Sequence, residues 1–303
     1  MSTFAHPPET IAIGELTVRR LGYGAMRLPG PEVWGEPANP SRAVATVRRA
    51  IELGVNFIDT AWYYGPWVSN RILVEALHPY PSDLVIATKL GGMRRPDKSW
   101  GPANRPEELR RGCEDDLRTL RRERLDVVHL RWIPSGVPLD DQLGALLDLQ
   151  REGNIRHIGL SNVNRAQVAA ALTRTPIVTV QNPYSAGGGG GRITRLTHAV
   201  VEDPDAVLSL CEERGIAFLP FFPLAVGALG SGERPALDAA ANRHGATRSQ
   251  IALAWLLARS PVILPIPGTG SPEHVEENWG ARRLPLTSDD VQAIADETRA
   301  LDP

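Results

Sequence analysis

The sequence is poor in lysine and in cysteine. Of its 33 Lys and Arg residues, only Lys89 and Lys98 are lysine, so arginine carries nearly all the positive charge. A lysine inside the apolar run around Lys89 must therefore do something that arginine cannot do. The two cysteines, Cys113 and Cys211, fall in separate helix-like segments and match no metal or redox pattern. This usage predicts a reducing, cytoplasmic location and no bound metal.

Clusters of basic charge and long apolar runs are also absent from the sequence. A formal net charge of -2 without a clustered Lys/Arg face excludes a typical nucleic-acid-binding protein. The longest apolar runs, such as 251–258, are too short to cross a membrane, and the first residues show no secretory pattern. With 42% hydrophobic residues over 303 positions, we expect a single domain, 1–303, with a large core.

Short apolar runs alternate with helical patterns along nearly the whole chain. A turn at Gly14-Glu15 predicts an N-terminal β-hairpin, and Ser41 is predicted to cap the first helix. Strands are predicted at 21–26, 55–58, 84–90, 125–132, 155–162, 177–184, 216–224 and 262–269. Because parallel strands need long crossovers, this order predicts a (β/α)₈ TIM barrel behind the hairpin.

The stretch Val55–Gly65 places an acid and a phenol beside the end of a buried strand. Asp59 stands where the apolar run stops, and Tyr64 follows five residues later. A carboxylate and a phenol at a strand exit suit proton transfer. In the simpler interpretation, Asp59 caps a loop and Tyr64 is packing.

Other predicted strands also end in polar or unusual residues. Barrel enzymes build their active sites at the carboxyl ends of their strands, so the arrangement is typical of a catalyst. The residues at these ends are Asp59, Lys89, His129, Arg131, Ser161, Asn162, Gln181, Asn182, Pro267, Gly268 and Thr269.

A glycine run, Ala186–Gly191, follows the sixth predicted strand. Consecutive glycines leave the backbone nearly unrestrained, so the run is either a flexible surface loop or a flap over the site.

Several motifs together resemble the aldo-keto reductase superfamily, in particular small bacterial pyridoxal-reductase-like members. The motifs are GYGAM, NFIDTA with YG, VIATK, GLSN, VQNPYS, FFPLA and IPGTGS with HVEEN, and they span 11–278. The resemblance implies a barrel that reduces an aldehyde or ketone with NADPH bound in an extended pose. No GxGxxG motif opens a strand–helix unit, in agreement with this expectation.

The resemblance implies that Tyr64 donates the proton and that Lys89 and Asp59 assist it. A phenol is a poor donor near neutral pH, and a neighbouring ammonium lowers its pKa. The Asp59 carboxylate would hold the Lys89 ammonium in place, which explains a lysine in an arginine-rich chain.

The cofactor residues follow from the same resemblance, with Ser161, Asn162 and Gln181 on the nicotinamide carboxamide. The full implied set is Ala25, Met26, Asp59, Ser161, Asn162, Gln181, Phe221, Phe222, Pro223, Leu224, Gly227, Gly268, Gly270, His274, Glu277 and Asn278. Many members place Lys or Arg at the positions of Gly268 and His274 to hold the 2′-phosphate. NADPH is the expected cofactor, and NADH remains open.

The fourth strand departs from the family pattern. The family histidine follows the strand's aspartate by five residues, and counting from Asp126 gives Arg131, whereas His129 comes two residues earlier. Either Arg131 replaces the histidine or a register shift brings His129 into its role. Potassium-channel β subunits also lack the histidine and reduce carbonyls slowly, so a cofactor-sensing module is the alternative function.

Aromatic side chains in the predicted loops indicate a flat or apolar substrate. The predicted pocket residues are Trp34, Trp62, Tyr63, Trp100, His129 and Trp132. An arginine beside the reacting carbon would suit a small carbonyl substrate that also carries negative charge.

Overall fold

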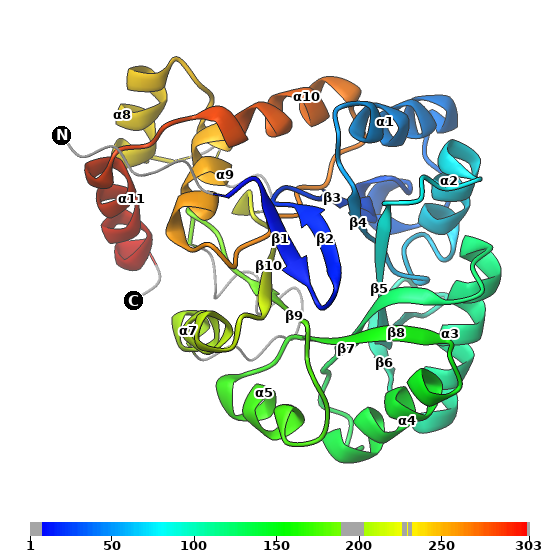
Figure 1. Ribbon diagram of the computed structural model, residues 1–303. Coiled ribbons are helices and arrows are strands. Elements are labelled where there is room, and N and C mark those ends of the chain that lie inside the picture. Colours follow the sequence, from blue (N-terminus) through cyan, green and yellow to red (C-terminus); the bar gives the residue numbers. More distant parts are fainter. Residues whose placement is uncertain (1–7, 189–202, 226–228, 230–231, 302–303) are drawn as a thin grey trace.

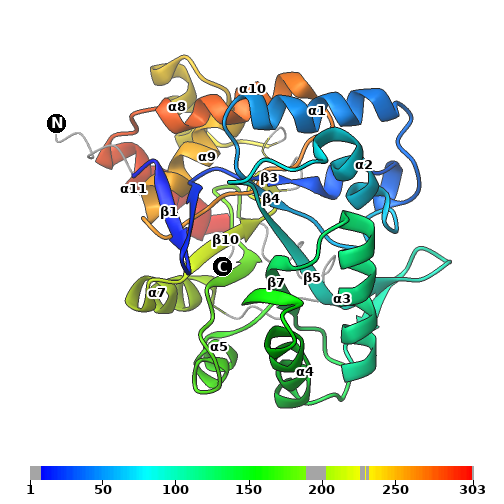
Figure 2. The ribbon, with the colours of Figure 1, turned by 45° about the vertical axis from the view of Figure 1, so that its right-hand side comes forward.

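Parallel strands surrounded by helices form a curled sheet in the computed structural model, which describes residues 8–188, 203–225, 229 and 232–301 (Figures 1 and 2). The strand order is β10-β9-β8-β7-β5-β4-β3, and neighbouring strands are parallel. The strands are β3 Tyr23–Gly24, β4 Phe57–Asp59, β5 Val85–Arg94, β7 Leu125–Arg131, β8 Ile155–Ser161, β9 Thr179–Pro183 and β10 Ala217–Phe221.

The predicted eighth strand, 262–269, closes this sheet although it has no regular strand structure. On one side the Leu264 N–H donates to the Phe218 carbonyl at 2.8 Å, and on the other the Gly22 N–H donates to the Pro265 carbonyl at 2.9 Å. Because Pro265 has no N–H, it accepts a hydrogen bond but interrupts a regular ladder. The predicted (β/α)₈ barrel is confirmed, and proline explains why its last strand is irregular.

Helices cover the outside of the sheet, and a Pro commonly opens them. They are α1 Pro40–Glu52, α2 Val68–Leu77, α3 Pro106–Leu120, α4 Leu139–Arg151, α5 Arg165–Leu172, α7 Pro204–Arg214, α8 Pro235–His244, α9 Arg248–Arg259, α10 Pro272–Gly280 and α11 Ser288–Leu301. The predicted Ser41 cap is wrong, because Asn39 Oδ1 accepts from the Arg42 N–H at 2.9 Å. Pro40 then occupies the first helical position, where its fixed φ fits and its missing N–H costs nothing.

The predicted N-terminal hairpin is confirmed and lies across one end of the barrel (Figure 1). Its strands are β1 Thr10–Ile13 and β2 Leu16–Arg19, paired antiparallel. Ile13 and Val18 are fully buried and belong to one apolar cluster with Phe57 and other inward-facing strand residues. Since this hairpin fills the amino end of the strands, the carboxyl end is left for a site.

The third predicted strand extends beyond its expected end at Leu90. β5 continues to Arg94 and folds back through a turn into β6 Trp100–Ala103, with Arg94 opposite Trp100. This second hairpin adds a wall above the strand ends.

Candidate active site

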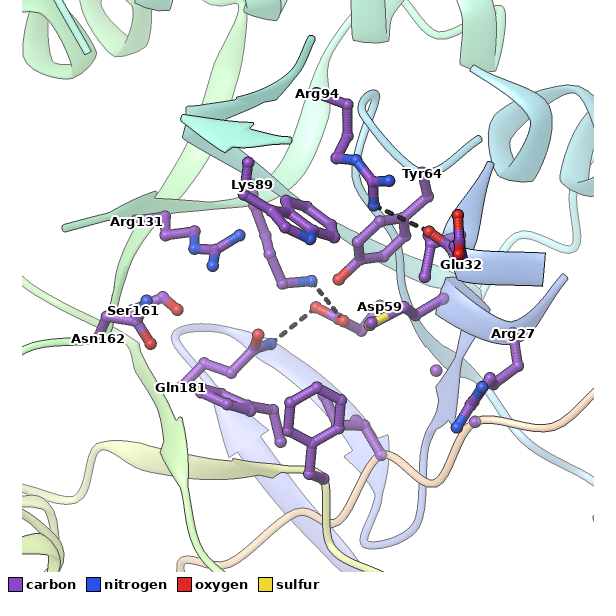
Figure 3. A pocket seen from close by; sticks show the side chains of 18 of the residues that line it. Arg27, Glu32, Asp59, Tyr64, Lys89, Arg94, Arg131, Ser161, Asn162 and Gln181 are labelled. Carbon is purple, nitrogen blue, oxygen red and sulfur yellow. Dashed lines mark hydrogen bonds and ion pairs between the residues drawn. The ribbon is translucent and has the colours of Figure 1, made fainter. Parts of the chain in front are cut away.

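A cavity of about 720 Å³ lies over the carboxyl ends of the strands (Figure 3). Four strands end on a residue that lines this cavity: β4 ends at Asp59, β7 at Arg131, β8 at Ser161 and β10 at Phe221. The predicted site residues that the cavity brings together are Met26, Asp59, Tyr64, Lys89, Trp100, Arg131, Ser161, Asn162, Gln181, Phe221, Phe222, Pro223, Leu224 and Gly268.

Asp59 and Lys89 form a buried ion pair at the floor of the cavity. Lys89 Nζ donates to Asp59 Oδ2 at 2.5 Å and to the Thr60 carbonyl at 3.0 Å. Gln181 Nε2 donates to the other carboxylate oxygen at 2.8 Å, as the dashed lines in Figure 3 mark. Each side chain of the pair is 5% exposed, so the charges depend on these partners rather than on water.

Tyr64 lies beside this pair with its ring centroid 5.2 Å from Lys89 Nζ. Burial raises the pKa of Tyr64, the Asp59 charge raises it further, and the Arg131 charge opposes both. The expected lowering of this pKa by Lys89 stays a prediction, and burial and the Asp59 charge outweigh any such effect here. The phenol therefore holds its proton at neutral pH, as an acid catalyst must.

The two candidates on the fourth strand, β7, have different environments. Arg131 lines the cavity, whereas His129 is fully buried with its Nε2 3.0 Å from Thr179 Oγ1. Burial lowers the pKa of His129 to about 4, so the ring is neutral. His129 does not reach the substrate pocket in which it was predicted, because its side chain points into the barrel core.

Asn162 presents an unsatisfied acceptor beside Ser161. Its backbone has φ 59°, in the left-handed region, where asparagine is better tolerated than most residues. Its side-chain Oδ1 is buried, and no hydrogen-bond donor reaches it from the described part of the chain. Since buried polar atoms are normally paired, a ligand carboxamide N–H₂ would complete this site.

The segment after β10 supplies an apolar wall. Phe221 and Phe222 meet edge to face with ring centroids 5.3 Å apart, and Pro223 and Leu224 continue the lining. The predicted cofactor residue Gly227 lies outside the described residues, as does the glycine run from position 189 onward.

Several predicted cofactor residues do not line the cavity. Ala25 is fully buried, because the 3-10 turn Ala25–Arg27 directs it inward, where its carbonyl accepts from Ser69 Oγ at 2.9 Å. Beyond Gly268, the chain leaves the cavity and enters α10, where Ser271 Oγ accepts from the His274 N–H. The predicted residues located there, outside the cavity lining, are Gly270, His274, Glu277 and Asn278.

Trp100 lines the cavity, but the other predicted aromatics do not. Tyr63 is fully buried and meets the Trp100 ring edge to face at 5.8 Å. Trp62 packs toward α3, within contact of Gly112, and Trp132 packs against the outer core. The ring centroid of Trp34 lies 5.6 Å from the guanidinium carbon of Arg94. Trp62 and Tyr63 lie in a turn rather than a strand, so each ring is placed by its own packing, and of the predicted aromatics only Trp100 lines the cavity.

The β5–β6 hairpin contributes lining residues that the sequence analysis missed. The sequence does contain a signal for this hairpin, because Pro96-Asp97 is a pair typical of turns and Gly91-Gly92 follows closely after Lys89. The hairpin residues that were not predicted are Arg94, Asp97, Lys98 and Ser99. Lining residues from other segments that were not predicted are Gly24, Arg27, Glu32, Val33 and Ile266.

Known proteins of one family are similar to this chain in sequence. The model of the aldo/keto reductase family matches residues 20–297. Pyridoxine 4-dehydrogenase of Escherichia coli is 43% identical over 291 residues, which cover 94% of this chain and 96% of the relative. An uncharacterized oxidoreductase of Schizosaccharomyces pombe is 40% identical, with 97% and 91% covered.

Solved structures agree in fold. An aldo-keto reductase from Klebsiella pneumoniae in complex with NADPH has a TM-score of 0.76 and 27% identity, covering 100% of this chain and 96% of that chain. The thermostable aldo-keto reductase Tm1743 has a TM-score of 0.79 and 27% identity, with 95% and 99% covered. With the barrel, the Asp59–Lys89 pair and Tyr64 in one cavity, these similarities establish that the chain belongs to the aldo/keto reductase family of oxidoreductases.

Proposed function

We propose that this protein reduces an aldehyde or ketone to the alcohol with NADPH, and that Tyr64 donates the proton. The observation that carries the proposal is the meeting of Tyr64, the Asp59–Lys89 pair and Arg131 in one cavity at the carboxyl ends of the strands. Family membership and the NADPH complex of a structural neighbour support the choice of reaction and cofactor.

The residues divide the work of the reaction. Bound NADPH supplies the hydride that reaches the carbonyl carbon, and the carbonyl oxygen then needs a proton. Tyr64 gives its phenolic proton to that oxygen, because burial keeps the phenol protonated until an acceptor with developing negative charge arrives. Arg131 stabilises the charge on that oxygen and on the phenolate, since its guanidinium stays protonated throughout.

The cavity provides groups that fit the cofactor. The Asn162 acceptor, with Ser161 and Gln181 beside it, suits the carboxamide of nicotinamide. Phe221 offers a flat face at the same edge. Gly268 would let the chain approach the adenosine half, and the amino end of α10 suits phosphate. We keep NADH as a second possibility, because neither Gly268 nor His274 supplies the basic side chain that many members use.

A planar aldehyde is our preferred substrate. Trp100 and Phe221 present aromatic surface to the cavity, and a relative with 43% identity is named for pyridoxine, a flat heteroaromatic alcohol. The alternative of a cofactor-sensing module has weaker support, because the proposed acid and its supporting pair are all retained around one cavity.

The chain as a whole fits a cytoplasmic enzyme of one domain. Cys113 and Cys211 are both buried free thiols, and burial raises the pKa of each to about 12. The family match over residues 20–297 supports the proposal of one barrel domain in this stretch. None of the helices in the described ranges has the length and apolarity that a bilayer crossing needs.

Steady-state oxidation of NADPH with a panel of aldehydes, pyridoxal among them, tests this function. We expect turnover with planar aldehydes, and a much lower rate when NADH replaces NADPH. Tight cofactor binding without turnover of any aldehyde or ketone would favour the sensing module instead. Asn162→Gly, which keeps the left-handed backbone but removes the amide, should weaken NADPH binding in equilibrium titrations.

A further inference from the structure

Arg94, on the β5–β6 hairpin, is held over the cavity by aromatic rings. Its side chain lines the cavity, and the residue is 6% exposed. The guanidinium carbon lies 4.2 Å from the ring centroid of Trp100 and 5.6 Å from that of Trp34. Both distances are within the range of cation–π contact, so the two indoles fix the position of the charge. Figure 3 shows this guanidinium directed toward the side of the cavity where Tyr64 lies.

The carboxylates that line the cavity have other partners. Asp59 is paired with Lys89, and Glu32 is paired with Lys98 at 3.1 Å in an exposed contact. The Asp97 carboxylate accepts from the Ser99 N–H at 2.9 Å. None of these acids forms an ion pair with Arg94 in the described part of the chain, although the Glu32 charge acts on Arg94 from a greater distance.

Arg94 itself is anchored by a neutral acceptor. Its Nη1 donates to the Glu32 main-chain carbonyl at 2.9 Å. Its Nε is buried and finds no acceptor among the described residues, and no carboxylate oxygen of those residues lies within ion-pair distance. Burial lowers the pKa of Arg94, and the Glu32 charge opposes this shift only in part, so a bound anion would stabilise the guanidinium further.

A second guanidinium shares the same indole. The Arg131 guanidinium carbon lies 5.5 Å from the Trp100 ring centroid, and Arg131 also lines the cavity. Trp100 is thus flanked by two arginines, and an anionic oxygen bound beside its ring would interact with both. Arginine is well suited to such an oxygen because its planar fork donates two parallel hydrogen bonds to a carboxylate.

We infer that Arg94, together with Arg131, forms an anion subsite, so that the substrate is a planar carbonyl compound that carries a carboxylate or similar anionic oxygen. The inference rests on the proposed function and adds the substrate class to it. The Trp100 ring would stack on the planar body while the guanidinium groups hold the anion. Binding of the anion offsets the cost of the buried charge of Arg94.

A purely structural role for Arg94 makes a different prediction. If Arg94 only braced the hairpin against Glu32 and Trp34, its loss would affect every substrate alike. An anion subsite changes the preference between charged and neutral substrates, so matched substrate pairs separate the two roles.

The test compares 3- and 4-formylbenzoate with their methyl esters, in the wild type and in Arg94→Gln, with NADPH as donor. We expect the wild type to prefer the formylbenzoates. Arg94→Gln should lower kcat/KM for the preferred formylbenzoate about 10- to 100-fold, the usual loss for a hydrogen bond to a charged group. The corresponding ester should change little, which also shows that the variant folds.

Lys98→Gln is the matched control, because it removes a lining cation that is already paired with Glu32. The Lys98→Gln variant should prefer the formylbenzoates over their methyl esters as strongly as the wild type does. Equal losses for acid and ester in Arg94→Gln, no loss at all, or a wild-type preference for the esters would each overturn the inference.

Failure of the proposed function would look different, since the wild type would then reduce neither member of any pair. Binding of 3- and 4-(hydroxymethyl)benzoate, followed by tryptophan fluorescence, tests the subsite without turnover. Weaker binding to Arg94→Gln than to the wild type supports the inference, and equal binding overturns it.

Discussion

Lys89 Nζ and Asp59 Oδ2 lie 2.5 Å apart, and each side chain is 5% exposed. Their residues occupy adjacent parts of neighbouring strands, since Asp59 is in register with Ala87, two positions before Lys89. The Lys89 ammonium is held on the Asp59 carboxylate while it lies 5.2 Å from the centroid of the Tyr64 ring. The pair fixes the geometry around Tyr64, and the Arg131 charge acts to lower the pKa of the phenol.

Replacement of Tyr64 by phenylalanine should nearly abolish reduction, because the phenol is the proposed proton donor. We expect kcat to fall by about two to four orders of magnitude, the usual range for general acid catalysis. NADPH affinity, measured by fluorescence titration, should stay close to that of the wild type. Tyr63→Phe is the control, since Tyr63 does not line the cavity. The assignment is wrong if the control is the damaging change.

Lys89→Arg should be nearly as harmful as Lys89→Met. The buried space around Asp59 and the Thr60 carbonyl accepts a compact ammonium, and a guanidinium fork is broader and planar. Lys89→Met should also destabilise the fold by about 3–5 kcal/mol, because Asp59 then loses the cation that pairs with it. Chemical denaturation and kcat/KM together check this. A Lys89→Arg enzyme with normal activity would contradict the geometric argument.

Arg131→Ala should lower kcat about 100- to 1000-fold, as expected when one donor to a developing oxyanion is lost. Arg131→His should recover part of the loss and introduce a pH dependence near neutrality, since imidazole titrates there and guanidinium does not. His129→Ala should leave kcat nearly intact and lower stability instead, because His129 is a buried core residue bonded to Thr179. A collapse of kcat in His129→Ala alone would reverse these roles.

Asp116 should make the stability of the fold depend on pH. Its carboxylate is fully buried and accepts from Thr88 Oγ1 and Asn70 Nδ2, each at 2.7 Å. Burial raises the pKa of Asp116 from 3.8 to about 7 in the folded protein. Between these values the folded state binds more protons than the unfolded state, so the free energy of unfolding falls as the pH rises from about 4 to 7.

Asp116→Asn mimics the protonated carboxyl and should remove this part of the pH dependence. We expect the difference in unfolding free energy between wild type and variant to change by a few kcal/mol across that range. Urea denaturation at several pH values measures it. A constant difference would show that Asp116 does not change its protonation in this range.

The sequence by itself determined the barrel and which polar residues meet at the carboxyl end of its strands. Apolar runs separated by capped helices define parallel strands, and parallel strands gather their carboxyl ends at one place, so Asp59, Lys89, Arg131 and Gln181 had to meet. The scarcity of lysine in an arginine-rich chain is enough to single out Lys89 as a residue with a special role.

The tertiary structure decided which side chains reach the cavity and what surrounds their charges. His129 lies two residues before Arg131 on the same face of β7, so its deeper position in the barrel, and not alternation, buries it. Packing turns Trp62 and Trp132 away from the cavity. The extension of β5 into a hairpin places Arg94 on Trp100, which no local pattern specifies. Periodicity describes which side of an element is apolar. The direction and the partners of a single side chain depend on residues that are distant in sequence and that only folding brings together.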